Sequence, residues 1–202
     1  MLFYSFILGF SSSYLGTIAP SMLNITATKI SLEKNKKEAI NYAIGVSIIV
    51  LLQAFIALLF LKTILNNPLI LETIQKASIF IFGILSIVFF RKALQERKEN
   101  FKKNKHKGFI TGIALSLINM FSIPFYCAVA GYFNMYGWLN LNTQSVVVFV
   151  IGSSLGTYFI LYNYILLAQK IAHSLRRLTK YMNLALALIT GTVALATFIK
   201  IL

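Results

Sequence analysis

The sequence predicts an all-α, polytopic membrane protein whose six transmembrane helices form two inverted three-helix repeats. Composition is the first reason: 58% of the 202 residues are apolar and 12% are charged, and the mean hydropathy is +0.78. A soluble domain is about 45–50% apolar and about 25% charged. Long uncharged runs and basic residues gathered in alternate loops are the other two reasons. We expect a single transmembrane domain over residues 1–202.

Six segments are apolar enough to cross a membrane, because a helix of about 20 apolar residues spans the hydrocarbon core. Four runs carry no charged side chain: residues 1–28, 39–61, 108–169 and 181–199. The run from 108 holds two crossings joined by a polar turn at 134–142. The remaining crossing, residues 77–90, also needs residues 73–76, with Lys76 reaching to the surface. The first run also permits a signal-peptide interpretation, but it lacks a basic n-region and exceeds the usual apolar length.

The positive charge falls on one side of the predicted membrane. Sixteen of the nineteen basic residues lie in the segments that follow spans one, three and five. The opposite side carries Lys62, Lys76 and Lys200. The positive-inside rule therefore places the three basic segments in the cytoplasm and both termini outside. We expect these segments to contact anionic lipid head groups, and since orientation explains their charge, we expect no nucleic-acid partner for residues 91–107.

The residue inventory predicts no enzyme, cofactor or metal site. Cys127 is the only cysteine, which excludes a disulfide within the chain and a cysteine-rich metal site. His106 and His173 lie in predicted loops without carboxylate or cysteine neighbours at metal spacing. The chain contains no aspartate, so a Ser–His–Asp triad is impossible.

Matching features recur in the two halves of the chain. The pairs are Pro20 with Pro124, YAIGVS at 42–47 with FVIGSS at 149–154, and Gly83 followed by Arg91 with Gly191 followed by Lys200. They predict a first repeat at residues 1–92, a basic loop at 93–107 and a second repeat at 108–202. A unit of three spans enters the membrane from the opposite side the second time, which is an arrangement common in secondary transporters.

The intramembrane prolines predict where a substrate binds. Proline breaks a helix, so we expect each span to restart after its proline and to present unpaired backbone N–H groups there. The helix dipole adds roughly half a positive charge at such an amino end. In inverted repeats, the half-helices that follow Pro20 and Pro124 would turn their amino ends toward each other. A carboxylate is the expected ligand.

Small and polar residues mark the predicted substrate pathway. In span one they recur every three or four residues, at Ser5, Gly9, Ser12, Gly16, Pro20 and Asn24. We predict a pathway formed by Gly16, Thr17, Pro20, Asn24, Gln53, Ser116, Asn119, Ser122 and Pro124. Close helix packing is the alternative role for the glycines. Hydrogen bonding between helices is the alternative for the amides, which are costly in hydrocarbon without partners.

Three segments carry a family resemblance. The first is GTIAPSMLNITATKISLEKNKKEAINYAIG at 16–45, the second LSLINMFSIPFY at 115–126, and the third YMNLALALITGTVALATFIKIL at 181–202. They are similar to the glycine-proline motif with its basic loop, the asparagine-proline pair of span four and the last helix of the LysE/RhtB amino-acid exporters. The resemblance implies six spans, export of amino acids by alternating access, and a place in the bacterial cytoplasmic membrane.

The departures from the family pattern indicate the cargo. Pro20 is followed by Ser21 rather than by a glycine-proline pair, and Asn119 is followed by Met120. Lysine exporters of this type carry an acidic residue in span two, where this chain has Gln53. All five acidic residues lie in predicted loops or at span ends. A cationic cargo would lack a counter-charge inside the membrane, so we expect a neutral amino acid as the small-molecule substrate.

Other interpretations stay open at this stage. The altered motifs are also compatible with a non-transporting membrane protein that assembles or signals with a partner. A channel is less consistent, because no ring of charges or repeated filter sequence occurs. The oligomeric state is open, a homo-oligomer included.

The predicted topology can be tested by cysteine labelling in a Cys127→Ser background. Asn140→Cys should react with an impermeant thiol reagent in intact cells, because the loop at 134–142 is predicted to lie outside. Lys103→Cys should react only after permeabilisation. Labelling of position 103 in intact cells would contradict both the topology and the inverted repeat.

Overall fold

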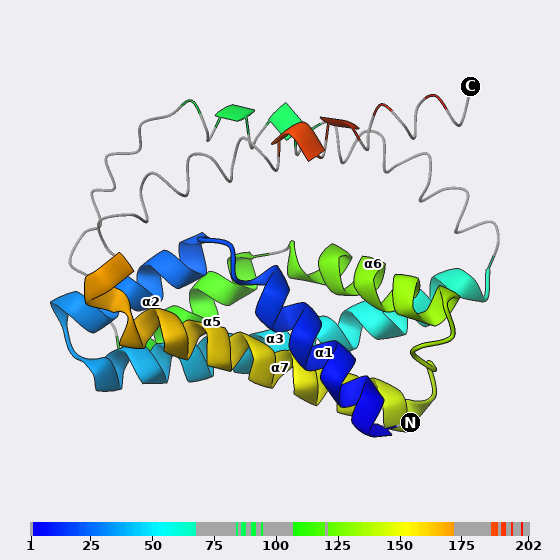
Figure 1. The fold of residues 1–202 in the computed structure, drawn as a ribbon, viewed down its shortest axis with the longest axis horizontal. Coiled ribbons are helices and arrows are strands. Elements are labelled where there is room, and N and C mark those ends of the chain that lie inside the picture. The colour runs from blue at the N-terminus through cyan, green and yellow to red at the C-terminus, as the bar shows by residue number, and fades with distance from the viewer. Residues whose placement is uncertain are drawn as a thin grey trace. The chain divides into compact units, whose positions relative to one another are not determined.

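The computed structural model describes residues 2–67, 84, 86–87, 90–91, 94, 107–119, 121–171, 187–189, 191–192, 195 and 199. Throughout this described part the regular structure is α-helical, and no strand occurs in it. The helices are α1 (Leu2–Gly16), α2 (Met22–Glu33), α3 (Lys36–Leu65), α5 (Gly108–Ile118), α6 (Ser122–Met135) and α7 (Thr143–Leu166) (Figure 1). The predicted all-α membrane class is confirmed at this level.

The helices match three of the predicted crossings. α3 and α7 are each long and apolar enough to cross a membrane alone, and α5 with α6 form a third candidate span that bends by 66°. The predicted first span is divided into α1 and α2 by residues 17–21. Most of the predicted crossings at 73–90 and 181–199 falls outside the described residues. The predicted count of six therefore stays a prediction.

The chain forms two compact units. The first consists of Met1–Thr63 with Lys105–His173, and the second of Ile64–Asn104 with Ser174–Leu202. In the second unit, the Ser86 hydroxyl donates to the Ala187 carbonyl at 2.9 Å. A Cβ added at Gly191 would lie 3.0 Å from Ser86 Oγ. The predicted third and sixth spans therefore contact each other within this unit.

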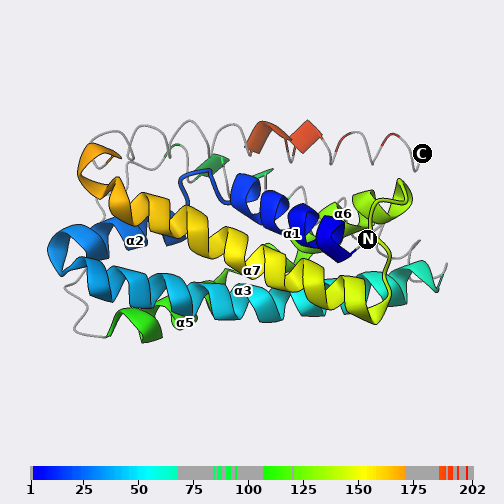
Figure 2. The same cartoon turned by 60° about the horizontal axis from the view of Figure 1, so that its bottom comes forward.

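In the first unit, α1 lies across α7 (Figures 1 and 2). A Cβ added at Gly9 would overlap the Phe149 carbonyl oxygen, and one at Gly152 would overlap the Phe6 carbonyl oxygen. Small residues let membrane helices approach this closely, and close packing drives their association where lipid is as apolar as the side chains. Glycine packing thus sets the distance between α1 and α7.

Glycines bring α5 equally close to α3 (Figure 2). A Cβ added at Gly112 would overlap the Tyr42 carbonyl oxygen, and one at Gly45 would overlap the Phe109 carbonyl oxygen. At the start of α5, the Glu38 carboxylate accepts a hydrogen bond from the Gly108 backbone N–H at 2.6 Å. A negative charge at a helix amino end is stabilising, so Glu38 fastens α3 to α5.

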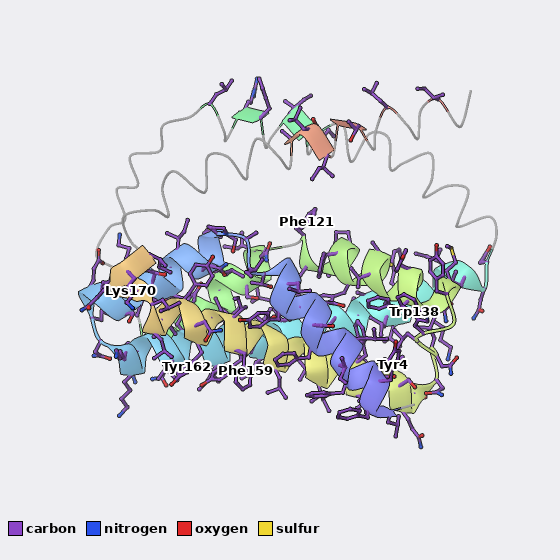
Figure 3. The ribbon with its side chains drawn as sticks, viewed as in Figure 1. Tyr4, Phe121, Trp138, Phe159, Tyr162 and Lys170 are labelled. Atoms are coloured by element: carbon purple, nitrogen blue, oxygen red, sulfur yellow. The ribbon has the colours of Figure 1, made fainter. Side chains whose placement is uncertain are left out.

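The two ends of the first unit differ chemically. Tyr4 and Trp138 lie at one end and Lys170 lies at the other (Figure 3). The Trp138 ring packs near the rings of Phe133 and Tyr136, with centroids 6.0 and 5.7 Å away. At this end a hollow of about 310 Å³ is lined by Tyr4, Ser5, Gly137, Trp138, Asn140 and Ser145. Aromatic side chains of this kind suit a membrane–water boundary.

Replacing the tightly packed glycines should destabilise the protein. We expect Gly152→Ala and Gly112→Ala each to cost about 1–3 kcal/mol through overpacking, seen as a lower melting temperature in detergent. Gly131→Ala is the matched control, because its Cβ would meet Leu61 at 3.4 Å, an ordinary contact, and alanine favours a helix. Unchanged melting of both tightly packed variants would contradict the close helix contacts.

Candidate functional site

The first helix break, residues 17–21, is held by side chains that bind the carbonyls left over at the end of α1. The Asn24 amide donates from Nδ2 to the carbonyl oxygens of Thr17 at 2.6 Å and Ala19 at 2.8 Å. The Tyr164 hydroxyl donates to the Ile18 carbonyl at 2.8 Å. These carbonyls have no partner within a helix, and lipid offers none. Asn24 and Tyr164 therefore stabilise the interruption.

The break ends where α2 begins with unpaired backbone donors. Ser21 is the N-cap residue in an extended conformation, and its side chain makes no capping bond. Among the described residues, the N–H groups of Met22, Leu23 and Asn24 find no acceptor, and the first bond of the helix runs from Ile25 to Ser21 at 3.0 Å. These groups form an amino end with the partial positive charge of the helix dipole.

The second break lies between α5 and α6, at residues 119–121. The Gln53 side chain of α3 donates from Nε2 to the Ser116 carbonyl at 2.9 Å and to the Asn119 carbonyl at 3.3 Å. The Asn119 side chain donates across the break to Ser122 Oγ at 3.1 Å. Here too, side-chain amides form hydrogen bonds across the interruption.

The half-helix α2 restarts after Pro20, as we expected, whereas the second break lies before Pro124 and not after it. Pro20 is buried and stands two residues before the start of α2. Pro124 is the third residue of α6, where a missing N–H removes no bond within the helix. Span four is therefore broken between the end of α5 and the start of α6, and Pro124 belongs to the first turn of α6. Phe121, labelled in Figure 3, marks its start.

The two breaks are neighbours. A Cβ added at Gly16, the last residue of α1, would overlap the ring of Phe125 in the first turn of α6. From this meeting point α2 and α6 run in opposite directions along the bundle (Figure 1). The amino ends of both half-helices therefore begin near the same place in the first unit.

A buried hydroxyl cluster fastens the helices beside the breaks. Ser13 Oγ shares hydrogen bonds with the Tyr126 hydroxyl at 2.8 Å and with Thr157 Oγ1 at 2.6 Å. The three residues come from α1, α6 and α7, and each is at most 3% exposed. The sequence pattern pointed to Ser12 instead, whose hydroxyl bonds to the Leu8 carbonyl of its own helix. Only the folded arrangement distinguishes these adjacent serines.

Two buried amide oxygens stay without a hydrogen-bond partner in the part of the chain that the structure describes. They are Asn24 Oδ1 and Gln53 Oε1, and the residues are 0% and 6% exposed. The Tyr164 hydroxyl lies beside the Asn24 side chain, but its geometry directs its proton to Ile18. An unpaired buried acceptor costs free energy. Each break thus contains one unused acceptor.

All nine predicted pathway residues lie at or beside these breaks. The first break contains Thr17 and Pro20 and is flanked by Gly16 and Asn24. The second is bounded or contacted by Gln53, Ser116, Asn119, Ser122 and Pro124. Their role in transport stays a prediction. Within the described ranges, no group of three metal-binding side chains occurs. Side chains and free backbone groups are what this site offers a ligand.

Comparison with known proteins gives one match. The family model described as LysE type translocator matches residues 14–200, which takes in both breaks and all six named helices in whole or in part. No curated protein and no solved structure matches this chain.

The role of Asn24 in holding the first break can be measured by stability. Asn24→Leu keeps the volume but leaves two carbonyls without donors, so we expect a loss of about 1–3 kcal/mol and a lower melting temperature in detergent. Asn163→Leu is the control, because the Asn163 amide donates one bond, to the Tyr14 hydroxyl at 2.9 Å. An equal or smaller loss for Asn24→Leu would show that the break does not depend on this amide.

Proposed function

The chain belongs to the LysE type translocator family, and from this premise we propose that it exports small neutral amino acids by alternating access. Membership in a family of translocators supports membrane transport as its role. The finer proposal concerns its cargo, its site and its orientation. Similar small metabolites that bear a carboxylate fall within the same proposal.

One observation carries the proposal: the end of α1, where the first break begins, contacts the first turn of α6. Gly16 at the first break contacts Phe125 at the second, and the two half-helices run apart from there (Figure 1). Free N–H groups at Met22 and Leu23 and two helix dipoles favour an anion at this point. In transporters, substrate binds where interrupted helices meet near the middle of the membrane. We propose that the substrate carboxylate binds here.

The charges around the breaks favour a neutral side chain on the cargo. Glu38 is engaged with the start of α5, and Glu33 pairs with Lys29 at 3.6 Å near the end of α2. Gln53 offers a neutral amide. In the described residues, no carboxylate contacts either break. A lysine side chain would therefore lose its hydration without gaining a counter-charge.

Two pairs of helix contacts support the inverted repeat. Gly9 contacts Phe149, and Gly112 contacts Tyr42. Gly112 lies 103 residues after Gly9, whereas Tyr42 lies 107 residues before Phe149. The first pair joins α1 to α7, and the second joins α5 to α3. Such an exchange of partners is what a twofold relation between the halves produces. We propose two repeats at residues 1–92 and 108–202, related in this way.

A hydrogen bond between α7 and α3 also supports the repeat, because it joins equivalent positions of the two halves. The Ser154 hydroxyl of α7 donates to the Ser47 carbonyl of α3 at 2.9 Å, and these serines are 107 residues apart. In the sequence match they are equivalent positions. Equivalent residues contact each other only near the axis that relates them, so α3 and α7 form the proposed centre of the transporter.

The proposed membrane is the bacterial cytoplasmic membrane, with both termini outside and the basic loops in the cytoplasm. The opposite placement of Trp138 and Lys170 in the first unit supports this orientation (Figure 3). The basic loops would then lie against anionic lipid head groups.

Efflux from preloaded proteoliposomes tests the function and the cargo together. We expect alanine, threonine and leucine to leave faster than lysine, by at least about tenfold, because no carboxylate at the breaks offsets the lysine charge. Empty liposomes give the leak of each amino acid. Faster efflux of lysine would contradict the assignment of a neutral site. Efflux of none above the leak would favour the non-transporting alternative.

A further inference from the structure

We propose that Asn24 Oδ1 and Gln53 Oε1 are the acceptors that bind the ammonium group of the cargo. The inference rests on the proposed function and adds to it the second half of substrate recognition. Half-helix amino ends account for a carboxylate, but they do not distinguish an amino acid from any other carboxylic acid. The two unused oxygens can make that distinction.

The orientation of each amide is fixed, so each free atom is an oxygen. Asn24 Nδ2 lies against two carbonyl oxygens, those of Thr17 and Ala19. Gln53 Nε2 lies against the carbonyls of Ser116 and Asn119. Reversing either amide would place oxygen against oxygen. Asn24 Oδ1 and Gln53 Oε1 are therefore acceptors, and they require a hydrogen-bond donor.

The acceptors lie beside the proposed carboxylate site. Asn24 is the third residue of α2, so its side chain starts within the turn that carries the free N–H groups. Gln53 contacts the carbonyl of Asn119, three residues before the start of α6. In an α-amino acid, one carbon separates the ammonium nitrogen from the carboxylate. A cargo carboxylate at the half-helix ends thus brings its ammonium group near these oxygens.

Burial makes the acceptors selective. A buried acceptor without a hydrogen bond costs free energy. A ligand that donates a hydrogen bond to it removes this cost, whereas a ligand without a donor does not and therefore binds more weakly. Neutral amide oxygens also suit an ammonium group whose charge is balanced by its own carboxylate. The proposed cargo is therefore a zwitterion, and a 2-oxo acid of the same size is a poor substrate.

The experiment compares export of alanine and pyruvate, which share a carboxylate and a methyl group. The ratio of the two rates in proteoliposomes does not depend on how much protein is folded. We expect wild type to favour alanine by about ten- to hundredfold, the value of a hydrogen bond to a charged group. Equal rates would overturn this inference and leave the carboxylate site standing. Absence of both activities would instead contradict the proposed function.

Matched variants separate the effect of each acceptor oxygen from that of the amide donor beside it. Asn24→Asp and Asn24→Leu both lose the donors to Thr17 and Ala19, but only the aspartate keeps an acceptor. Gln53→Glu and Gln53→Met form the same kind of pair. We expect the ratio to persist in the acidic variants and to fall at least about tenfold in the apolar ones. Asn163→Leu should keep the wild-type ratio.

Three results would overturn the assignment. The first is an unchanged alanine-to-pyruvate ratio in Asn24→Leu or Gln53→Met, which would mean that the oxygen removed does not bind the ammonium group. The second is a fall of the ratio in Asn163→Leu as large as in the apolar variants. The third is loss of the wild-type ratio when sodium is replaced by N-methylglucamine, which would assign the oxygens to a coupling cation.

Discussion

The structure depends on one constraint: a backbone that leaves its helix inside a membrane must find its hydrogen bonds within the protein. At residues 17–21 the Asn24 amide and the Tyr164 hydroxyl supply them. At the second break Gln53 supplies them from a different helix. The two interruptions are thus built features with their own partners. At the first break, the amino end of α2 keeps its free N–H groups while the carbonyls before it are satisfied.

Close packing then brings the interruptions together. Glycines let α1 lie on α7 and α5 lie on α3 with backbones in contact. Beside the break, α6 is hydrogen-bonded to the α1–α7 pair through the hydroxyls of Ser13, Tyr126 and Thr157. Apolar side chains alone would not select this arrangement, because lipid solvates them equally well. Glycine spacing and a few buried hydrogen bonds select it.

The sequence was sufficient for the apolar crossings that became α3, α7 and the α5–α6 pair, and for the residues at the two breaks. It placed the break of span four too late, because a proline in the first turn of a helix leaves the same pattern as one that ends a helix. It also grouped Glu38 with loop acids, although this carboxylate binds the start of α5. The hydroxyl cluster was beyond prediction, since its members are 113 and 144 residues apart.

The glycine contacts have a mechanical consequence. Two helices in backbone contact cannot slide or tilt against each other without losing that contact. At the glycines there is no flexible side chain to fill the gap that would open. We therefore expect α1 to move together with α7, and α5 together with α3. Movement between the two pairs should then be taken up where the chain leaves the helix, at residues 17–21 and between α5 and α6. Gly16 contacts the Phe125 ring, so a shift of the chain at one interruption reaches the other.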